Sequence, residues 1–179
     1  MSGGAMGCRV RIRPARETDF PVLYRLVREE VLPYAQQSSP GLRVTPDELR
    51  LRLRRSAVLV AVRGASGRRR GGAVIGFVSV IAAPGDRFRA DGGDVELKGG
   101  DAWIDLIAVA RSMQAKGVGS RLIKTAESLA ERRGAGRAWV IVDAANRRAM
   151  AFYGRHGYAD YGAWPTPSHR LMGKSLGGG

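Results

Sequence analysis

Residues 103–133 constrain the fold more than any other segment, because a strand, a glycine-containing turn and a helix follow one another there. The apolar run 103–109 is typical of a strand, and Gly117 and Gly119 open an amphipathic helix over residues 117–133. At such a junction the unpaired N–H groups of the first helical turn point outward, and the helix dipole favours negative charge. The segment therefore predicts an α/β fold with an anion site that suits a phosphate-bearing ligand.

The two glycines also have a simpler interpretation, since glycine permits a tight turn or the close packing of a helix. Two well-known nucleotide motifs do not fit this chain. A dinucleotide-binding motif would need a small residue in place of Leu122. The run Gly173-Lys174-Ser175 resembles the end of a Walker motif, but Ser168 stands where the first glycine of that motif belongs. A different kind of pyrophosphate site is needed.

Length and composition indicate one domain without metal. The chain has 179 residues, which is enough for a single substantial core. No apolar run approaches the roughly 20 residues of a membrane span, and no signal-peptide region is recognisable. One cysteine, Cys8, and two histidines offer neither a disulfide framework nor a cluster of metal ligands. We therefore expect a cytoplasmic protein with no metal and no membrane association.

The formal net charge is +14, from 30 Lys and Arg against 16 Asp and Glu. Such a charge attracts nucleotides, phosphorylated cofactors and nucleic acids. The arginines, however, are spread along the chain, and the aromatic residues, 7% of the total, are not interleaved with them. An arginine-rich composition therefore accounts for most of the charge, which alone does not assign a partner, and we do not expect nucleic acid to be one.

The order of predicted elements is β-α-α-β-β-β-α-β-α-β-β, which indicates a mixed α/β domain without internal repeats. Thr45 and Glu48 form a capping box at the start of the second helix, and Pro33 is expected to end the first. Residues 84–100 are predicted to be a long, functional loop. Strands are expected at residues 9–13, 57–62, 73–82, 103–109, 138–142, 158–161 and 169–174.

These elements predict one central, mixed and twisted sheet of about six to seven strands, flanked by about four helices. Residues 9–176 are expected to form this single domain. Residues 1–8 are expected to be a disordered or vector-derived N-terminus, and residues 177–179 a flexible tail.

Two segments in this order resemble the motifs of the GNAT superfamily of acyl-CoA-dependent N-acyltransferases. Gln114-Ala-Lys-Gly117-Val-Gly119 resembles motif A of the family, Q/R-x-x-G-x-G/A. About thirty residues later, Asn146-x-x-Ala149-x-x-Phe152-Tyr153-x-x-x-Gly157-Tyr158 resembles its motif B. The resemblance is close over residues 101–160 and loose over the N-terminal third.

The resemblance implies acetyl-CoA as co-substrate. In the family, the strand before motif A parts from its neighbour at a bulge, and pantetheine inserts there; that role falls to the backbone of Ile107, Ala108 and Val109. Lys116 and Arg121 could add charge-assisted contacts to the phosphates. The pyrophosphate would lie on backbone N–H groups of Gln114, Ala115, Lys116, Gly117, Val118, Gly119 and Ser120.

The resemblance to motif B implies roles for two further residues. Tyr153 stands at the position of the family's frequent general acid, which protonates the leaving thiolate. The alternative is a core aromatic residue beside Phe152. Asn146 matches a residue that contacts the pantetheine or thiol region, although asparagine is also a good helix N-cap, and both can hold.

Asp105 is the candidate for handling the amine, because it interrupts the apolar strand 103–109. A carboxylate in mid-strand is costly without a partner or a function. It could bind the acceptor ammonium, or act as base directly or through water; a salt bridge to an arginine is the structural alternative. Glu96 and Asp101 are the next candidates for this base.

The remaining reactive side chains have simpler interpretations. His169 is expected at the surface, with a catalytic role as the alternative, and His156 at a helix end. The run 68–70 is expected to be a solvated basic hairpin tip. Cys8 lies outside any acid–base setting, so we expect no covalent cysteine intermediate.

We therefore expect an N-acetyltransferase that transfers acetyl from acetyl-CoA directly to a primary amine of a small acceptor, for which an amino-sugar or a sugar nucleotide is a candidate. The alternatives are an acetyltransferase of protein N-termini or lysines, and a non-catalytic module that binds acyl-CoA or nucleic acid. Oligomeric state stays open, with a homodimer as one alternative.

Overall fold

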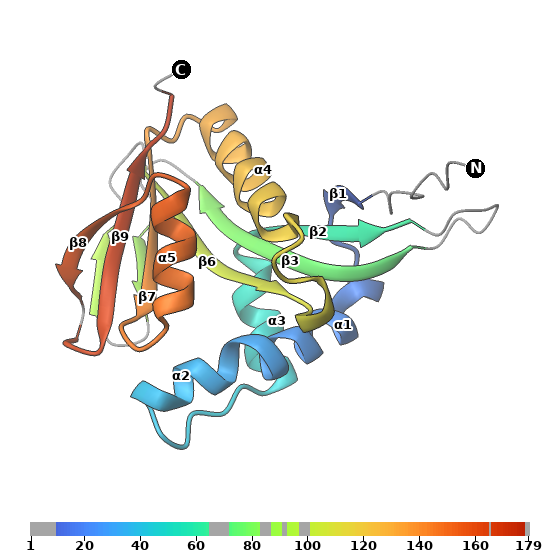
Figure 1. Cartoon of the computed structure of the whole chain (residues 1–179), viewed down its shortest axis with the longest axis horizontal. Coiled ribbons are helices and arrows are strands. Elements are labelled where there is room, and N and C mark those ends of the chain that lie inside the picture. The colour runs from blue at the N-terminus through green and yellow to red at the C-terminus, as the bar shows by residue number, and fades with distance from the viewer. Residues whose placement is uncertain are drawn as a thin grey trace, which may run out of the picture.

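A seven-stranded sheet with strand order β1-β2-β3-β6-β7-β9-β8 organises the fold in the computed structural model (Figure 1). The structure describes residues 10–64, 72–82, 87–90, 93–96, 101–164 and 166–177. The sheet strands are β1 (Val10–Pro14), β2 (Ala57–Arg63), β3 (Ala73–Ala82), β6 (Asp101–Val109), β7 (Arg137–Asp143), β8 (Ala159–Ala163) and β9 (His169–Ser175). The predicted fold class and the order of these strands along the chain are confirmed.

The sheet consists of two antiparallel parts, β1-β2-β3-β6 and β7-β9-β8, which are joined by one parallel pair. The β6–β7 pair is parallel, whereas all other neighbours in the sheet are antiparallel. The helix between β6 and β7 is α4 (Val118–Arg132), as a parallel crossover requires. Gly134 follows α4 in the left-handed conformation, with φ of 87°, and ends it as predicted.

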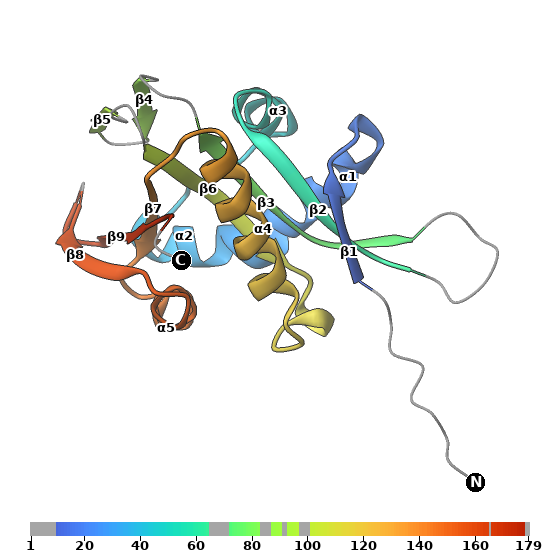
Figure 2. The same ribbon diagram turned by 90° about the horizontal axis from the view of Figure 1, so that it is seen from above.

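Helices cover both faces of the sheet (Figure 2). On one face α4 and α5 (Arg147–Arg155) bury a core around Leu122, Ile123 and Tyr153. On the other face α1 (Phe20–Leu26) and α3 (Pro46–Arg54) pack against β2 and β3 around Phe77. None of the helices in the described residues combines the length and the hydropathy of a membrane span.

The prediction that Pro33 ends the first helix is wrong. The helix continues through a π-helical turn, Val27–Val31, into α2 (Leu32–Ser38). Proline lacks an N–H and clashes with the carbonyl four residues earlier. Here Pro33 lies in the first turn of α2, and the Leu32 N–H reaches back five residues to the Val27 carbonyl. The wider turn lets the chain stay helical across the proline.

Residues 84–100 were predicted to be a loop, and this is corrected in part. They contain a two-stranded hairpin of β4 (Arg87–Ala90) and β5 (Gly93–Glu96), which lies on the side of the sheet opposite α5 (Figure 2).

The local helix-start signals are confirmed. Thr45 and Glu48 form the capping box of α3, and the Asn146 side chain caps α5 by accepting the Ala149 N–H at 3.0 Å.

Candidate functional site

The parallel strands β6 and β7 part soon after they begin. Their pairing covers only Asp101 to Trp103 on β6. The register between β3 and β6 then shifts at Asp105, because Ser79 pairs with Leu106 while Val80 pairs with Ile104. Such a bulge bends a strand and strengthens its twist. From residue 104 to 109, β6 has no strand partner on its β7 side among the described residues.

A tight turn leads from this open edge of β6 into α4. Ala115 and Gly117 have φ values of 58° and 76°, in the left-handed region. The first bond of the helix joins the Arg121 N–H to the Gly117 carbonyl at 3.1 Å. The N–H groups of Val118, Gly119 and Ser120 therefore have no acceptor within the helix. Backbone N–H groups and the positive end of a 15-residue helix meet here.

The side chain of Gln114 holds this turn through two hydrogen bonds. Its side-chain Nε2 donates to the Val109 carbonyl at 2.9 Å and to Glu30 Oε2 at 2.8 Å. Glu30 also accepts the Arg111 N–H through Oε1 at 3.0 Å. The Lys116 ammonium donates to the Ser112 carbonyl at 2.9 Å, which closes the turn on itself. The side chain of Gln114 thus serves the turn's own geometry.

The helix of motif B packs directly on the helix of motif A. A Cβ atom at Gly119 would lie 3.2 Å from Phe152 Cε2 on α5. At Gly117 an added Cβ would meet nothing within 4 Å, so this glycine is required by its backbone angle. Glycine is therefore needed at the two positions for different reasons: at 117 for its backbone angle, and at 119 for the close approach of Phe152.

Tyr153 lies inside this packed layer, 3% exposed, with its ring 5.3 Å from Phe152 and 5.3 Å from Tyr158 in edge-to-face contacts. Burial raises the pKa of the Tyr153 phenol well above its usual range. The phenol therefore keeps its proton at neutral pH, as a general acid must.

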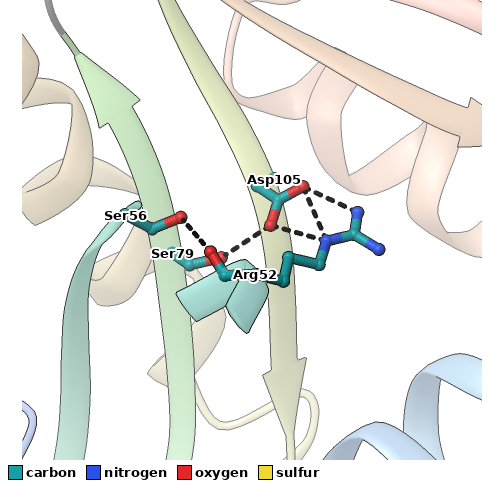
Figure 3. A network of polar contacts seen from close by, with 4 residues as sticks. All are labelled: Arg52, Ser56, Ser79 and Asp105. Atoms are coloured by element: carbon teal, nitrogen blue, oxygen red, sulfur yellow. Dashed lines mark hydrogen bonds and ion pairs between the residues drawn. The ribbon is translucent and has the colours of Figure 1, made fainter. Parts of the chain in front are cut away.

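Asp105 has a partner on α3 (Figure 3). Its carboxylate is fully buried and accepts from the guanidinium of Arg52, with Nε–Oδ2 at 2.8 Å and Nη2–Oδ1 at 2.6 Å. Ser79 on β3 donates to the same carboxylate at 3.4 Å. This bidentate geometry is the strong form of an ion pair. Asp105 thus forms a buried ion pair with Arg52 at the bulge where β6 and β7 part.

An aromatic cluster continues the face of the sheet that carries Asp105. Ser79 and Ile81 lie two residues apart on β3 and share a face. Ile81 packs with Trp103, and this pair contacts half-buried Trp139, Ile141, Trp164 and Leu171. Trp139 is the direct neighbour of Trp103 across the β6–β7 pair. Aromatic side chains therefore line the sheet beside Asp105.

The end of α2 is hydrogen-bonded to the end of β7. Ser38, the last residue of α2, donates its hydroxyl hydrogen to Asp143 Oδ2 at the end of β7. Asp143 Oδ1 accepts the Ala145 N–H at 2.8 Å, ahead of the α5 cap. The helical segment from Val27 to Ser38 therefore contacts the turn after β6 at one end and the end of β7 at the other (Figure 1).

Several predicted candidates lie away from this centre. His156 Nδ1 donates to the Phe152 carbonyl at 2.8 Å, which confirms its place at a helix end. His169 Nδ1 lies 2.8 Å from the Thr166 hydroxyl. Asp101 is half-buried at the start of β6. The Glu96 side chain, Cys8 and residues 68–70 lie outside what the structure describes. No group of metal-ligating side chains occurs among the described residues.

The sequence did not single out Arg52, Glu30 or Ser38. Each contacts a residue far along the chain: Arg52 is 53 residues from Asp105, and Glu30 is 84 from Gln114. Nothing local marks such pairs. The one available signal was Pro33, whose presence inside a helical segment predicts a disturbance of the preceding turn.

Known proteins share the sequence pattern and the fold of this chain. A model of the acetyltransferase (GNAT) family matches residues 23–158. The structure of Ard1 from Thermoplasma volcanium is similar with a TM-score of 0.68 at 20% identity, covering 93% of this chain and 97% of that one. A search of curated protein sequences finds no match.

Two similar structures were solved with a ligand. PaiA N-acetyltransferase from Thermoplasma acidophilum, in complex with coenzyme A, has a TM-score of 0.65 at 16% identity, covering 94% of this chain and 99% of that one. Arabidopsis thaliana NAA60, in complex with acetyl-CoA, has a TM-score of 0.68 at 14% identity, covering 93% and 98%. At these identities the likeness shows the fold alone.

Proposed function

The chain belongs to the GNAT family of acetyltransferases, and we propose that it transfers the acetyl group of acetyl-CoA directly to a primary amine of a small molecule. The observation that carries the proposal is the open edge of β6, which leads without interruption into the turn at the start of α4. An extended pantetheine arm suits the unpaired edge of a strand, and a pyrophosphate suits helical N–H groups.

The donor side is proposed from backbone groups. Pantetheine would run along Ile107, Ala108 and Val109. The pyrophosphate would lie on the N–H groups from Ala115 to Ser120, with positive φ at Ala115 and Gly117 shaping the turn, whereas the Gln114 N–H donates to the Arg111 carbonyl at 3.3 Å. Asn146 would contact the pantetheine or thiol region while its Oδ1 caps α5. Lys116 and Arg121 would supply charge near the phosphates.

The chemical step needs one acid and one proton acceptor. The neutral amine attacks the thioester carbonyl carbon, a C–N bond forms, and the C–S bond breaks. We assign protonation of the departing thiolate to Tyr153, whose raised pKa keeps the phenol protonated. The proton lost by the amine would pass to Asp105, directly or through water, or to solvent.

Asp105 can meet an amine only if its partner gives way. Its carboxylate is fully buried against Arg52, whose side chain is 39% exposed. We propose that the acceptor ammonium takes over part of the coordination that Arg52 supplies. The Ser79 hydroxyl, at 3.4 Å, would keep the carboxylate oriented during this exchange.

The aromatic cluster supports a small, ring-bearing acceptor. Half-buried Trp139 and Trp164 lie on the Asp105 face and offer apolar faces of the kind that line small-molecule sites. A net charge of +14 attracts anionic compounds. An amino-sugar, free or linked to a nucleotide, combines a ring, an amine and in the second case a phosphate.

The test is an acceptor screen that detects the thiol of released CoA, with amino-sugars, amino-sugar nucleotides, simple polyamines and peptides with free N-termini as acceptors. We expect release above the acceptor-free rate with the amino-sugar compounds. Release with peptides alone would assign the activity to proteins instead. Acetyl-CoA should also raise the melting temperature through binding to the folded state. No acetyl-CoA binding at millimolar concentration would overturn the proposal.

A further inference from the structure

A single helical segment spans the two diverging strands of the site. It runs from α1 through the π-helical turn into α2, across the ends of β6 and β7 (Figure 1). Glu30, in the π-helical turn, contacts the turn after β6, and Ser38, at the end of α2, contacts the end of β7. This segment is therefore connected to both sides of the proposed acetyl-CoA site.

Glu30 makes the contacts that matter for the donor side. Its two carboxylate oxygens accept two different donors of the same turn, the Arg111 N–H at 3.0 Å and Gln114 Nε2 at 2.8 Å. Gln114 Nε2 in turn donates to the Val109 carbonyl at the end of β6. One carboxylate thus links the end of β6, the turn and the helical segment, with charge-assisted bonds.

Glu30 lies within the π-helical turn that precedes Pro33. Pro33 cannot donate the bond that a regular helix would need, and the Leu32 N–H bonds to Val27 five residues back. The π-helical turn, Val27–Val31, carries Glu29 and Glu30 at neighbouring positions. Glu30 is half-buried against the turn, while its neighbour Glu29 is exposed.

We infer that Glu30 is a positioning residue for acetyl-CoA. It would hold Gln114, and through Gln114 the turn from Ala115 to Gly119, in binding geometry before the co-substrate arrives. This inference rests on the proposed function. A carboxylate would repel the phosphates, so Glu30 would not act as a ligand; its contribution would be the order of the turn, which binding would otherwise have to supply.

The experiment is calorimetric titration of acetyl-CoA into the full chain and its variants. Glu30→Ala should weaken binding about tenfold, because two charge-assisted bonds that order the turn are lost. Glu29→Ala removes the same charge one residue away, and it should leave the affinity unchanged or slightly raised. Glu30→Gln keeps the shape and one acceptor, so its affinity should lie between those of the wild type and Glu30→Ala.

Variants of Gln114 provide the second part of the experiment. Gln114→Ala should weaken acetyl-CoA binding as Glu30→Ala does, and the double variant should lose clearly less affinity than the sum of the two single losses, because the two residues share the Glu30–Gln114 contact. The kcat at saturating acetyl-CoA should stay unchanged in Glu30→Ala, since the chemical groups are not altered.

The outcomes separate the two proposals. If the wild type binds acetyl-CoA and Glu30→Ala binds as tightly as Glu29→Ala, the role of Glu30 is overturned while the proposed function stands. Additive losses in the double variant would overturn it too. If the wild type does not bind acetyl-CoA, both proposals fall. If Glu30→Ala does not fold, Glu30→Gln carries the same comparison.

Discussion

Gly119 lies against the ring of Phe152, so that the glycine of one motif makes room for an aromatic residue of the other. A Cβ atom at position 119 would be 3.2 Å from Phe152 Cε2 and 3.4 Å from Cζ, closer than side chains normally approach. The glycine allows α4 and α5 to pack at this distance beside the proposed pyrophosphate site. The spacing of the two motifs along the chain therefore has a packing cause as well as a chemical one.

Gly119→Ala should lower the free energy of unfolding by about 1–2 kcal/mol, because the added methyl overpacks the contact with Phe152. Phe152→Leu alone should also destabilise the protein. Together the two changes should cost clearly less than the sum of the single costs, since the smaller side chain accepts the methyl. Denaturant unfolding of the four proteins measures this, and strict additivity would contradict the packing account.

Gly117 offers a different test, because its φ of 76° is its only requirement in the structure. Gly117→Ala should cost about 1 kcal/mol of stability. Gly134→Ala is the matched control, with φ of 87° and open space at the Cβ position, and should cost about the same. Under the proposed function only Gly117→Ala should weaken acetyl-CoA binding. Equal affinities of the two variants would argue against a phosphate cradle at Gly117.

The sequence predicts those parts of the fold that local signals determine. The capping box of Thr45 and Glu48, the cap at Asn146 and the stop at Gly134 all depend on neighbouring residues, and all three are confirmed. Pro33 misled the prediction because the π-helical turn that absorbs it depends on packing rather than on propensity. Residues 84–100 contain the hairpin β4–β5, which the richness in glycine and aspartate concealed.

For the candidate site, the motifs predicted where the donor would bind but not how the turn is held. The turn at Gly117 follows from residues close in sequence. The pairs Arg52–Asp105 and Glu30–Gln114 join segments 53 and 84 residues apart, and each depends on how helices dock on the sheet. The sequence did raise a salt bridge as one alternative for Asp105. It could not identify which of the many arginines would provide it.

Asp105→Asn should lower kcat/KM for the acceptor about 100-fold and leave acetyl-CoA affinity unchanged, if the carboxylate receives the amine as proposed. Arg52→Met alone should destabilise the protein by about 3 kcal/mol, because it leaves a buried carboxylate without its cationic partner. Combining both changes should restore most of the stability.

The double variant Arg52→Met with Asp105→Asn decides between a structural and a catalytic role. Recovered stability with activity still lost is the expected result. Recovery of both would mean that Asp105 serves only the ion pair with Arg52. Thermal unfolding and acceptor kinetics on the same preparations provide the two measurements.

Asp19 should make stability dependent on pH in the acid range. It accepts from Arg13 Nη1 at 2.7 Å and Nη2 at 2.9 Å and from the Arg16 N–H at 2.7 Å, and its side chain is 8% exposed. The bonds from the Arg13 guanidinium, chiefly, hold the pKa of the Asp19 carboxyl below its usual range. Its stabilisation is therefore complete above the unfolded-state pKa of about 4 and is lost as the pH falls through the lower native value.

Asp19→Asn should therefore lower the free energy of unfolding by about 2 kcal/mol at pH 7, and the gap to the wild type should shrink as the pH is lowered from 4 toward 2. Asp47→Asn is the control, since the Asp47 side chain is 94% exposed and its ion pair with Arg50 is at the surface. A gap that stays constant with pH would mean that the Asp19 contacts do not depend on its charge.

Tyr153→Phe should lower kcat about tenfold or more and leave acetyl-CoA affinity nearly unchanged, because only the proton donor for the thiolate is removed. Tyr158 is the matched control: its ring is 5.3 Å from that of Tyr153, and burial, together with the neighbouring Glu127 carboxylate, raises the pKa of its phenol. Tyr158→Phe should keep kcat, since the Tyr158 phenol has no role in the proposed chemical step. Burial raises the pKa of Tyr153, so the phenol stays in its acid form through the usual assay range and should add no alkaline limb to the kcat profile below about pH 10. Equal kcat values for the two variants would assign Tyr153 to packing, because both substitutions leave an aromatic ring in place.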